Sequence, residues 1–269
     1  MTRPRWGSHT LTRVRGGLEL RELGAGEFLA NLDACTRVYA AAMDPPEYQL
    51  PGRHSIMERH AGYAAFRAIA VIQAAADGPA ATGPAATGPA GTMPAGTRPA
   101  GTRPAGDRPA RGRAAGDRAA GDGPTWTGPA GNGPLIGFAY GFHGEGGQWW
   151  HDLVSQAVTS ACGREAAADW LTDSFEIAEV HVLPGHQGQG TGQAMMLRLT
   201  AGRPERTAVL STMDADTRAR RLYRRLGFTD LIAGYAFAGT DDPYAIMGAP
   251  LPLREGTPPP ARPERPSRW

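Results

Sequence analysis

The chain has 269 residues, 41% of them hydrophobic, which is enough to build a packed core in the part that folds. Its formal net charge is +2 and its 28 basic residues are all arginine, a balance that gives no reason to expect a nucleic-acid partner. Two cysteines, Cys35 and Cys162, exclude a disulfide framework and form no metal-binding pattern, so no metal is expected. Residues 1–17 lack the apolar segment of a secretory signal, and no run is long enough to span a membrane. We therefore expect a cytoplasmic protein with no membrane partner and a flexible N-terminus over residues 1–17.

The first predicted elements are a strand, two helices and a second strand. The alternation Leu-Glu-Leu-Arg-Glu-Leu predicts a short strand over residues 18–23. Apolar residues at helical spacing predict a helix over residues 28–43, and a shorter helix is expected over residues 54–63. An apolar run then predicts a strand over residues 66–73.

The composition changes abruptly after these elements. Over residues 78–132 a five-residue unit of the type Gly-Pro-Ala-Ala-Thr is repeated eleven times. Such a segment has little apolar surface to bury, and Pro and Gly oppose both helix and sheet, so residues 77–133 are expected to form a disordered repeat insert. A Pro- and Arg-rich tail over residues 254–269 is expected to be disordered as well. We place a single folded domain in the remaining residues, 18–76 and 134–253.

The chain after the insert supplies the second half of this domain. An apolar strand over residues 135–142 is expected to pair with residues 66–73 as an antiparallel neighbour. Trp149 and Trp150 cannot both face one core, so one of them is expected to cover an edge or to line a pocket. The remaining predictions are a helix over residues 166–171 and strands over residues 207–212, 231–237 and 244–247.

The most informative stretch runs from residue 175 to residue 199. Alternating apolar residues predict a strand over residues 175–182, and strong helix formers follow at residues 194–199. A glycine-dense turn joins the two elements. Glycines let backbone N–H groups point inward, and the start of a helix adds partial positive charge, a combination suited to a pyrophosphate.

Three types of phosphate-binding loop can be compared with this turn. A P-loop needs Lys and Ser or Thr after its last glycine, where this chain has Thr191 and Gly192. A dinucleotide fingerprint needs G-x-G-x-x-G, whereas residues 188–192 read G-x-G-x-G. The pattern [QR]-x-x-G-x-[GA] is met by Gln187, Gly190 and Gly192. On the loop alone, a plain strand-to-helix turn stays open as an alternative.

A second stretch, residues 219–228, ends in Tyr-x-x-x-Gly-Phe about thirty residues after the loop. Leu222, Tyr223 and Leu226 fall on one helical face, and Gly227 stands where a left-handed residue ends a helix. One predicted strand separates this helix from the loop. Together the two stretches resemble the GCN5-related N-acetyltransferase (GNAT) superfamily in residues, order and spacing.

The resemblance implies a fold, a cosubstrate and a set of binding residues. The fold would be of the α/β class, a twisted, mostly antiparallel mixed sheet of about six to seven strands with helices on both faces. The cosubstrate would be acetyl-CoA, and the reaction would move its acetyl group to a primary amine by direct attack in a ternary complex. Gly185 and His186 depart from the family, which usually has acidic or aromatic residues there. The residues implied to bind the cosubstrate are Val180, His181, Val182, Gln187, Gly188, Gln189, Gly190, Thr191, Gly192 and Tyr223.

The catalytic candidates follow from what acetyl transfer needs. An amine attacks a thioester only when it is unprotonated, so a carboxylate or an imidazole is needed as base. Glu176 and Glu179 fall where different branches of the family place their base, and His181 is a further candidate. Regular strand pairing would put the two glutamates on opposite faces, with His181 on the face of Glu179. Tyr223 matches the acid of the family. The competing interpretations are a solvated strand edge for the glutamates and core packing for Tyr223.

Two other classes of function stay open at this point. One is a non-catalytic, acyl-CoA-binding regulator with the same fold, and the other is a scaffold that acts through the repeat insert. The acceptor is expected to be a small amine, although an aminoglycoside, an amino acid or a protein N-terminus would fit the same chemistry. A homodimer is compatible with the sequence.

Overall fold

A computed structural model describes the placement of residues 12–14, 17–73, 123–127, 133–238 and 242–254. All of these residues belong to one compact unit, formed by Met1–Ala75 and Gly123–Trp269. Most of the expected repeat insert and nearly all of the expected tail lie outside the described residues, and their disorder stays a prediction. Within the described residues, no helix is long and apolar enough to cross a membrane.

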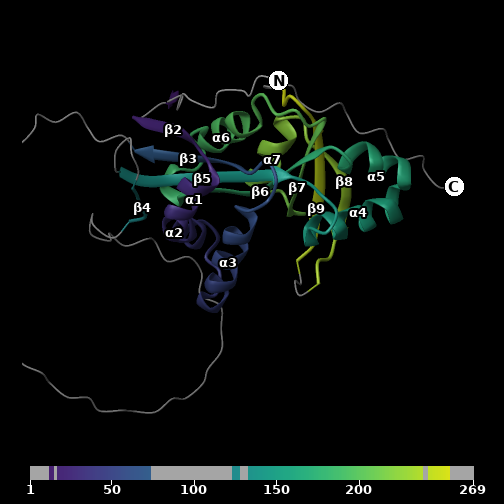
Figure 1. Ribbon diagram of the computed structural model, residues 1–269, viewed down its shortest axis with the longest axis horizontal. Coiled ribbons are helices and arrows are strands. Elements are labelled where there is room, and N and C mark those ends of the chain that lie inside the picture. Colours follow the sequence, from purple (N-terminus) through teal and green to yellow (C-terminus); the bar gives the residue numbers. More distant parts are fainter. Residues whose placement is uncertain (1–11, 15–16, 74–122, 128–132, 239–241, 255–269) are drawn as a thin grey trace, which may run out of the picture. The chain divides into compact units, whose positions relative to one another are not determined.

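Nine strands of the described residues pair in one sheet, in the order β1-β2-β3-β5-β6-β7-β9-β8, with β4 beside β5 (Figure 1). All neighbours are antiparallel except β6 and β7, which run parallel. The fold is therefore a mixed α/β fold with a mostly antiparallel sheet, as the sequence predicted. The strands are β1 Thr12–Val14, β2 Leu18–Leu23, β3 Arg67–Gln73, β4 Thr125–Trp126, β5 Gly133–His143, β6 Ser174–Val182, β7 Thr207–Met213, β8 Thr229–Tyr235 and β9 Tyr244–Pro250.

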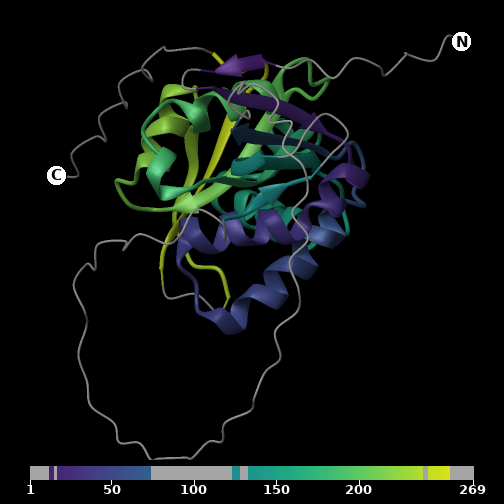
Figure 2. The ribbon, with the colours of Figure 1, turned by 90° about the vertical axis from the view of Figure 1, so that its left-hand side faces the viewer.

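Helices cover both faces of this sheet, as Figures 1 and 2 show for α6 and α7 on one side and α2 and α3 on the other. The α-helices are α1 Ala25–Ala30, α2 Leu32–Met43, α3 Leu50–His60, α4 Trp149–Cys162, α5 Arg164–Leu171, α6 Thr191–Thr200 and α7 Arg218–Arg225. Two short 3₁₀ helices, Glu47–Gln49 and Pro184–His186, complete the described elements.

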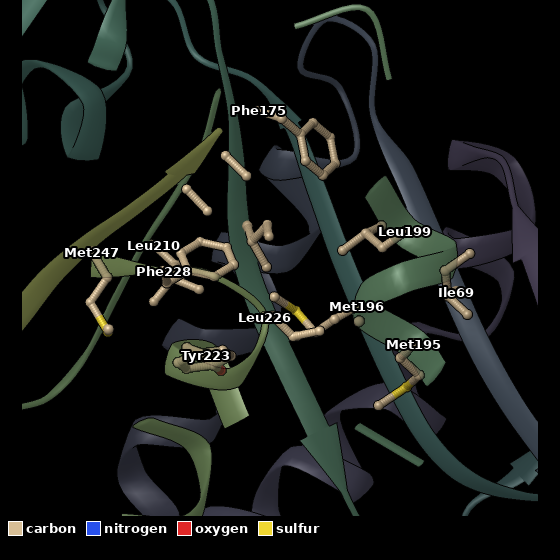
Figure 3. Close-up of a cluster of buried hydrophobic side chains, with 14 of the residues drawn as sticks. Ile69, Phe175, Met195, Met196, Leu199, Leu210, Tyr223, Leu226, Phe228 and Met247 are labelled. Atoms are coloured by element: carbon tan, nitrogen blue, oxygen red, sulfur yellow. The ribbon is translucent and has the colours of Figure 1, made fainter. Parts of the chain in front are cut away.

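On the first face, α6 and α7 pack over the middle of the sheet in a cluster that includes Met195, Met196, Leu199, Leu226 and Phe228 (Figure 3). Burial of side chains of this size removes apolar surface from water at roughly 25 cal/mol per Å², which makes this layer a major source of stability. The cluster fixes α6 and α7 against the strands, so the loop before α6 and the side chains of α7 have defined positions.

The second face carries two separate clusters. Helices α1 to α3 pack on β3 and β5 around Phe28, Phe138 and Tyr140. Helices α4 and α5 pack on β7 and β9 around Val209 and Ile246. β6 runs between the two groups of helices, because it pairs with β5 on one side and with β7 on the other.

Several segments differ from the sequence prediction, three of them in the first half of the domain. Thr125 and Trp126, placed within the insert, form β4, and the indole of Trp126 is fully buried. A single aromatic residue next to a repeat was too weak a signal against the surrounding composition. Residues 12–14, placed in the flexible N-terminus, form β1. The helix predicted over residues 28–43 is two helices, α1 and α2, with a break at Asn31.

The break at Asn31 has a physical cause in Thr127, the residue that follows β4. The Asn31 side-chain amide donates to the carbonyl of Thr127 at 3.1 Å, and its Oδ1 accepts the Thr127 N–H at 2.9 Å. These paired hydrogen bonds hold Asn31 outside helical geometry and connect the α1–α2 junction to the segment that follows β4.

Candidate active site

The sheet opens between its two parallel strands. Ser174 to Glu176 of β6 pair with Thr207 to Val209 of β7, and no later residue of β6 pairs with β7 in the described structure. β6 nevertheless continues to Val182 and β7 to Met213. The edge of β6 from Ile177 onward therefore presents backbone N–H and C=O groups that β7 does not use.

A cavity of about 450 Å³ lies at this opening. Val180, His181 and Val182 form one wall, the glycine turn forms the second, and α7 forms the third, with Ala42 and Met43 at the end of α2. The full lining is Ala42, Met43, Val180, His181, Val182, Gln187, Gly188, Gly190, Gly192, Gln193, Arg218, Ala219, Arg221, Leu222, Tyr223 and Arg225. Of the predicted cosubstrate residues, only Gln189 and Thr191 are not in the lining.

The turn between β6 and α6 has the geometry of a preformed anion site. Gly188 and Gly190 have φ values of 76° and 87°, in the left-handed region where a side chain would be strained. Gln187 donates to the carbonyl of Val182 at 3.0 Å and Gln189 donates to that of Gly185 at 3.1 Å, so both glutamines brace the turn from within. The first N–H groups of α6 have no partner inside the helix and are available to a phosphate.

The two glutamates of β6 lie on the same face of the sheet, and the prediction of opposite faces was wrong. Tyr140 of β5 pairs with Glu179, whereas the next residue, Gly141, pairs with Ile177, so Ala178 forms a β-bulge. A bulge adds one residue to the strand and reverses the alternation beyond it. Both Glu176 and Glu179 consequently face the side of α2 and α3, as does His181.

Glu179 is buried and paired through both of its oxygens. Oε1 accepts from Arg53 of α3 at 2.7 Å, and Oε2 forms a short hydrogen bond with Nε2 of His181. Burial alone raises the pKa of this carboxyl, but the neighbouring His181 and Arg53 outweigh burial and hold the pKa below its ordinary value. Tyr39 of α2 stands against the network, with its ring 5.1 Å from the His181 ring. Glu179 is thus a carboxylate held in one position by its two partners.

Glu176 has a different environment. It is 2% exposed, and its Oε1 accepts a hydrogen bond from Nδ1 of His151, in the first turn of α4, at 2.6 Å. Its second oxygen, Oε2, is buried and has no hydrogen-bond partner among the described residues. Burial raises the pKa of this carboxyl, with His151 opposing part of the rise. Glu176 is therefore the strand glutamate with an oxygen left to accept a proton.

Tyr223 lines the cavity from α7. Its ring packs on Phe228 with centroids 5.9 Å apart, at the margin of the cluster drawn in Figure 3. The helix ends immediately after it, where Phe228 N–H donates to the Tyr223 carbonyl at 3.0 Å and Gly227 takes φ 96°. Burial raises the pKa of the Tyr223 phenol, so the hydroxyl is protonated at neutral pH.

A buried ion cluster fixes α7. Arg220, 6% exposed, forms a short hydrogen bond with Asp214 after β7 and donates to Asp230 of β8 at 2.8 Å. Asp214 also accepts the N–H of Gly234 at 2.7 Å. Through this cluster the ends of two strands determine where Tyr223 stands.

Sequence reasoning missed Arg53, Tyr39 and His151. Arg53 and Glu179 are 126 positions apart, and His151 and Glu176 are 25 apart on different elements. Such pairs are too far apart in the chain for a local sequence pattern to predict that they are in contact. Of the two tryptophans, Trp149 is 66% exposed, whereas Trp150 packs on the α4–α5 cluster and donates to Ser211 at 3.2 Å.

Comparison with known proteins shows what part of this chain is similar to. Residues 136–230 match the family model of the acetyltransferase (GNAT) domain. This part of the chain is similar to a GNAT domain. It is similar to the GCN5-like protein acetyltransferase Rv2170 of Mycobacterium tuberculosis, with 49% identity over 123 residues, which are 44% of this chain and 60% of the relative. The chain thus spans less than two thirds of the length of that relative.

Two solved structures are also similar. One, described as a GNAT-family acetyltransferase, is from Desulfovibrio desulfuricans, with a TM-score of 0.47 and 11% identity over 87% of this chain and 98% of that one. The other is NAA60 of Arabidopsis thaliana in complex with acetyl-CoA, with a TM-score of 0.47 and 12% identity over 87% of this chain and 98% of that one. The matched GNAT segment contains both glutamates, the glycine turn and Tyr223, whereas Arg53 lies outside it.

Proposed function

We propose that this protein is an acyl-CoA-dependent N-acyltransferase that moves the acetyl group of acetyl-CoA to a primary amine. The supporting observation is a single cavity that joins the glycine turn, the open edge of β6 and the Tyr223 side chain. The transfer is direct, in a ternary complex. The two other classes of function, a regulator that only binds acyl-CoA and a scaffold, leave the Glu176 oxygen and Tyr223 without a role.

The residues at the opening fit acetyl-CoA. The turn over Gly188 and Gly190 and the start of α6 would hold the pyrophosphate, and Arg218 and Arg225 in the cavity lining would add positive charge for the phosphates. The unpaired edge of β6 at Val180 and Val182 would take the amide groups of the pantetheine arm. The bound cosubstrate would supply the acetyl group as an activated thioester.

Of the two strand glutamates, Glu176 is the better candidate for the base, judged by its hydrogen bonds and the direction of its pKa shift. A base needs a free lone pair and a pKa that is not too far below the working pH. Glu179 is poorly suited, because both of its oxygens are already held by Arg53 and His181, which also lower its pKa. Glu176 has a free Oε2 and a raised pKa, and it stands at the last position where β6 is still paired with β7.

Each residue then has a defined task. Glu176 takes a proton from the acceptor ammonium group, directly or through a water, and the free amine attacks the thioester carbonyl carbon. As the carbon–sulfur bond breaks, Tyr223 donates its phenolic proton to the departing sulfur, and the proton that the attacking nitrogen loses as the amide forms returns to the phenolate. Glu179 stays charged, and it orients His181 and Arg53 beside the reacting groups.

The acceptor is a small primary amine in this proposal. Protein N-termini and amino acids share the same reacting group, so a panel that contains a diamine, an aminoglycoside, an amino acid and a short peptide separates the candidates. The measurement is amine-dependent release of free thiol from acetyl-CoA, with the acetylated product identified by mass spectrometry. Initial-rate lines that intersect when both concentrations are varied would support the ternary complex, whereas parallel lines would contradict direct attack.

A further inference from the structure

His151 connects the buried Glu176 to the surface of the protein. The side chain of Glu176 is 3% exposed, whereas that of His151 is 12% exposed, and their 2.6 Å hydrogen bond bridges the two. His151 comes from α4, an element separate from β6, and lies outside the cavity lining described above. A base without solvent access needs a route by which its proton leaves, and His151 is the partner in contact with it.

The loop before α4 holds this imidazole in a fixed place. Gln148 is buried, donates to the carbonyl of His143 at 3.1 Å and accepts the N–H of Glu145 at 3.2 Å. Asp152 accepts the N–H of Gly147 through both oxygens, at 3.0 and 3.1 Å. These bonds set the start of the helix and with it the direction in which His151 projects.

Gly144 leaves the space in which the pair meets. A Cβ atom at this position would lie 2.5 Å from Oε1 of Glu176 and 2.8 Å from Nδ1 of His151. Contacts this short are not tolerated, so any side chain at residue 144 would push the two groups apart. Gly146 lies two residues further along the loop, and a Cβ atom added there would have no other heavy atom within 4 Å.

Several titratable groups surround the pair, and each shifts the pKa of His151 or of Glu176 in a definite direction. The hydrogen bond to Glu176 raises the pKa of His151, and burial opposes it, while Asp152 and Glu145 raise it further. On the other side, burial raises the pKa of Glu176, whereas His151 and His143 lower it and Asp152 raises it. The relay proposed below starts with Glu176 as the carboxylate and His151 as the imidazolium.

We propose that His151 is the proton exit of the active site, a positioning and relay residue that orients Glu176 and passes to solvent the proton that Glu176 takes from the acceptor amine. This inference rests on the proposed function and adds a residue that neither the sequence motifs nor the chemistry of the cavity include.

The proton count closes without another reactant. The acceptor ammonium gives one proton to Oε2 of Glu176, which is then neutral, and the imidazolium beside it is left without its countercharge. His151 loses the proton on Nε2 to water, and its remaining proton lies on Nδ1, in the hydrogen bond with Oε1. The carboxyl proton of Glu176 then passes to the neutral imidazole, which restores the carboxylate and imidazolium before the next turnover, so one proton taken from the ammonium has left as one proton in water.

The first test compares His151→Gln with His151→Ala in the amine-dependent thiol-release assay. Glutamine keeps an N–H donor for Glu176 but carries no charge and relays no proton. Both variants are expected to lower kcat/KM about tenfold or more near neutral pH. Both should also move the acid limb of the pH profile upward by roughly one unit, because Glu176 loses a cationic neighbour. A glutamine variant with the wild-type rate and profile would show that His151 is only structural.

The second test uses the glycines as a matched pair. Gly144→Ala is expected to separate Glu176 from His151 and to reproduce the rate loss and the shifted acid limb, with acetyl-CoA affinity unchanged. Gly146→Ala adds the same methyl group to the same loop where nothing is close, and it should behave as wild type. Equal kinetics for the two variants, both folded, would overturn the proposal.

A third readout does not depend on turnover. In histidine-labelled protein the NMR titration of His151, assigned through the His151→Gln variant, should show a lower pKa in Glu176→Gln than in wild type. An identical His151 pKa in the two proteins would contradict the coupling itself. Coupling without thiol release for any amine would instead overturn the proposed acetyl transfer, and the relay with it, so the two failures are distinguishable.

Discussion

Glu176 and Glu179 are three residues apart on β6, yet their surroundings give them opposite properties. Arg53 and His181 hold both oxygens of Glu179, whereas one oxygen of Glu176 has no partner among the described residues. Local pattern predicted that both would matter, because each fits a position of the family's base. It did not predict the opposite shifts of their pKa values, since those depend on groups from remote elements, among them Arg53 and His151.

Tyr223 permits a test of its hydroxyl alone. Tyr223→Phe keeps the packing on Phe228, and within the described residues no hydrogen bond of the hydroxyl is lost. The free energy of unfolding should change by less than about 1 kcal/mol. The rate should fall about tenfold or more with acetyl-CoA affinity unaltered, because only the proton donor is removed. A large loss of melting temperature with normal turnover would show that Tyr223 serves the core and that the acid is elsewhere.

Glu179 should make stability depend on pH. Its pKa is lower in the folded protein than the ordinary glutamate value of 4.5, so the unfolded chain binds the proton more readily. The stabilisation is complete above the unfolded pKa and is lost as pH falls through the folded pKa. Glu179→Gln should lower the free energy of unfolding by about 1–3 kcal/mol at pH 7, less than for a fully buried pair because Arg53 is 35% exposed.

Urea unfolding at pH 7 and near pH 3 checks this account. The gap in unfolding free energy between wild type and Glu179→Gln should narrow at the lower pH, where the unfolded chain binds the Glu179 proton more readily than the folded protein does. A gap that stays constant over this range would mean that the ion pair with Arg53 and the hydrogen bond with His181 do not stabilise the fold.

At the scale of elements, periodicity predicted most of the sheet. The strand over residues 18–23 has the predicted bounds, and seven strands were found where the pattern placed them. Helix α4 was missed because valine, serine and threonine, weak helix formers, occupy much of its length. The bulge at Ala178 was missed because one extra residue in a strand has no recognisable sequence pattern. It nevertheless decides on which face of the sheet Glu176 lies.

The glycine turn allows a comparison of charge at constant shape. Gly190 is left-handed, with φ 87°, a conformation that both asparagine and aspartate tolerate better than other side chains. Gly190→Asp should abolish acetyl-CoA binding, because a carboxylate would face the pyrophosphate, whereas Gly190→Asn should bind more weakly than wild type but measurably. Calorimetry on both folded variants checks this. Equal affinities would show that the turn does not contact the phosphates.

At the scale of the whole molecule, β4 sets how much of the insert can be removed. Trp126 is 1% exposed, and Thr127 is bonded to Asn31. Deletion of residues 78–117 should leave thiol release and melting temperature near wild type. Deletion of residues 78–132 removes β4 and should cost about 3–5 kcal/mol, as expected for the loss of a buried tryptophan. Activity lost in the shorter deletion, with the fold retained, would favour a scaffold or substrate-binding role for the repeats.

The most direct test of the account as a whole is the pH dependence of kcat/KM for thiol release in wild type, Glu176→Gln and Glu179→Gln. Glu176→Gln replaces the free carboxylate oxygen by an amide of the same shape. It should lower the rate by about 10²–10⁴ and flatten the rise of rate with pH. Glu179→Gln should lose stability but keep the rise. A Glu176→Gln variant with a near-wild-type rate, beside an inactive, folded Glu179→Gln variant, would contradict the assignment and move the base to the Glu179–His181 pair.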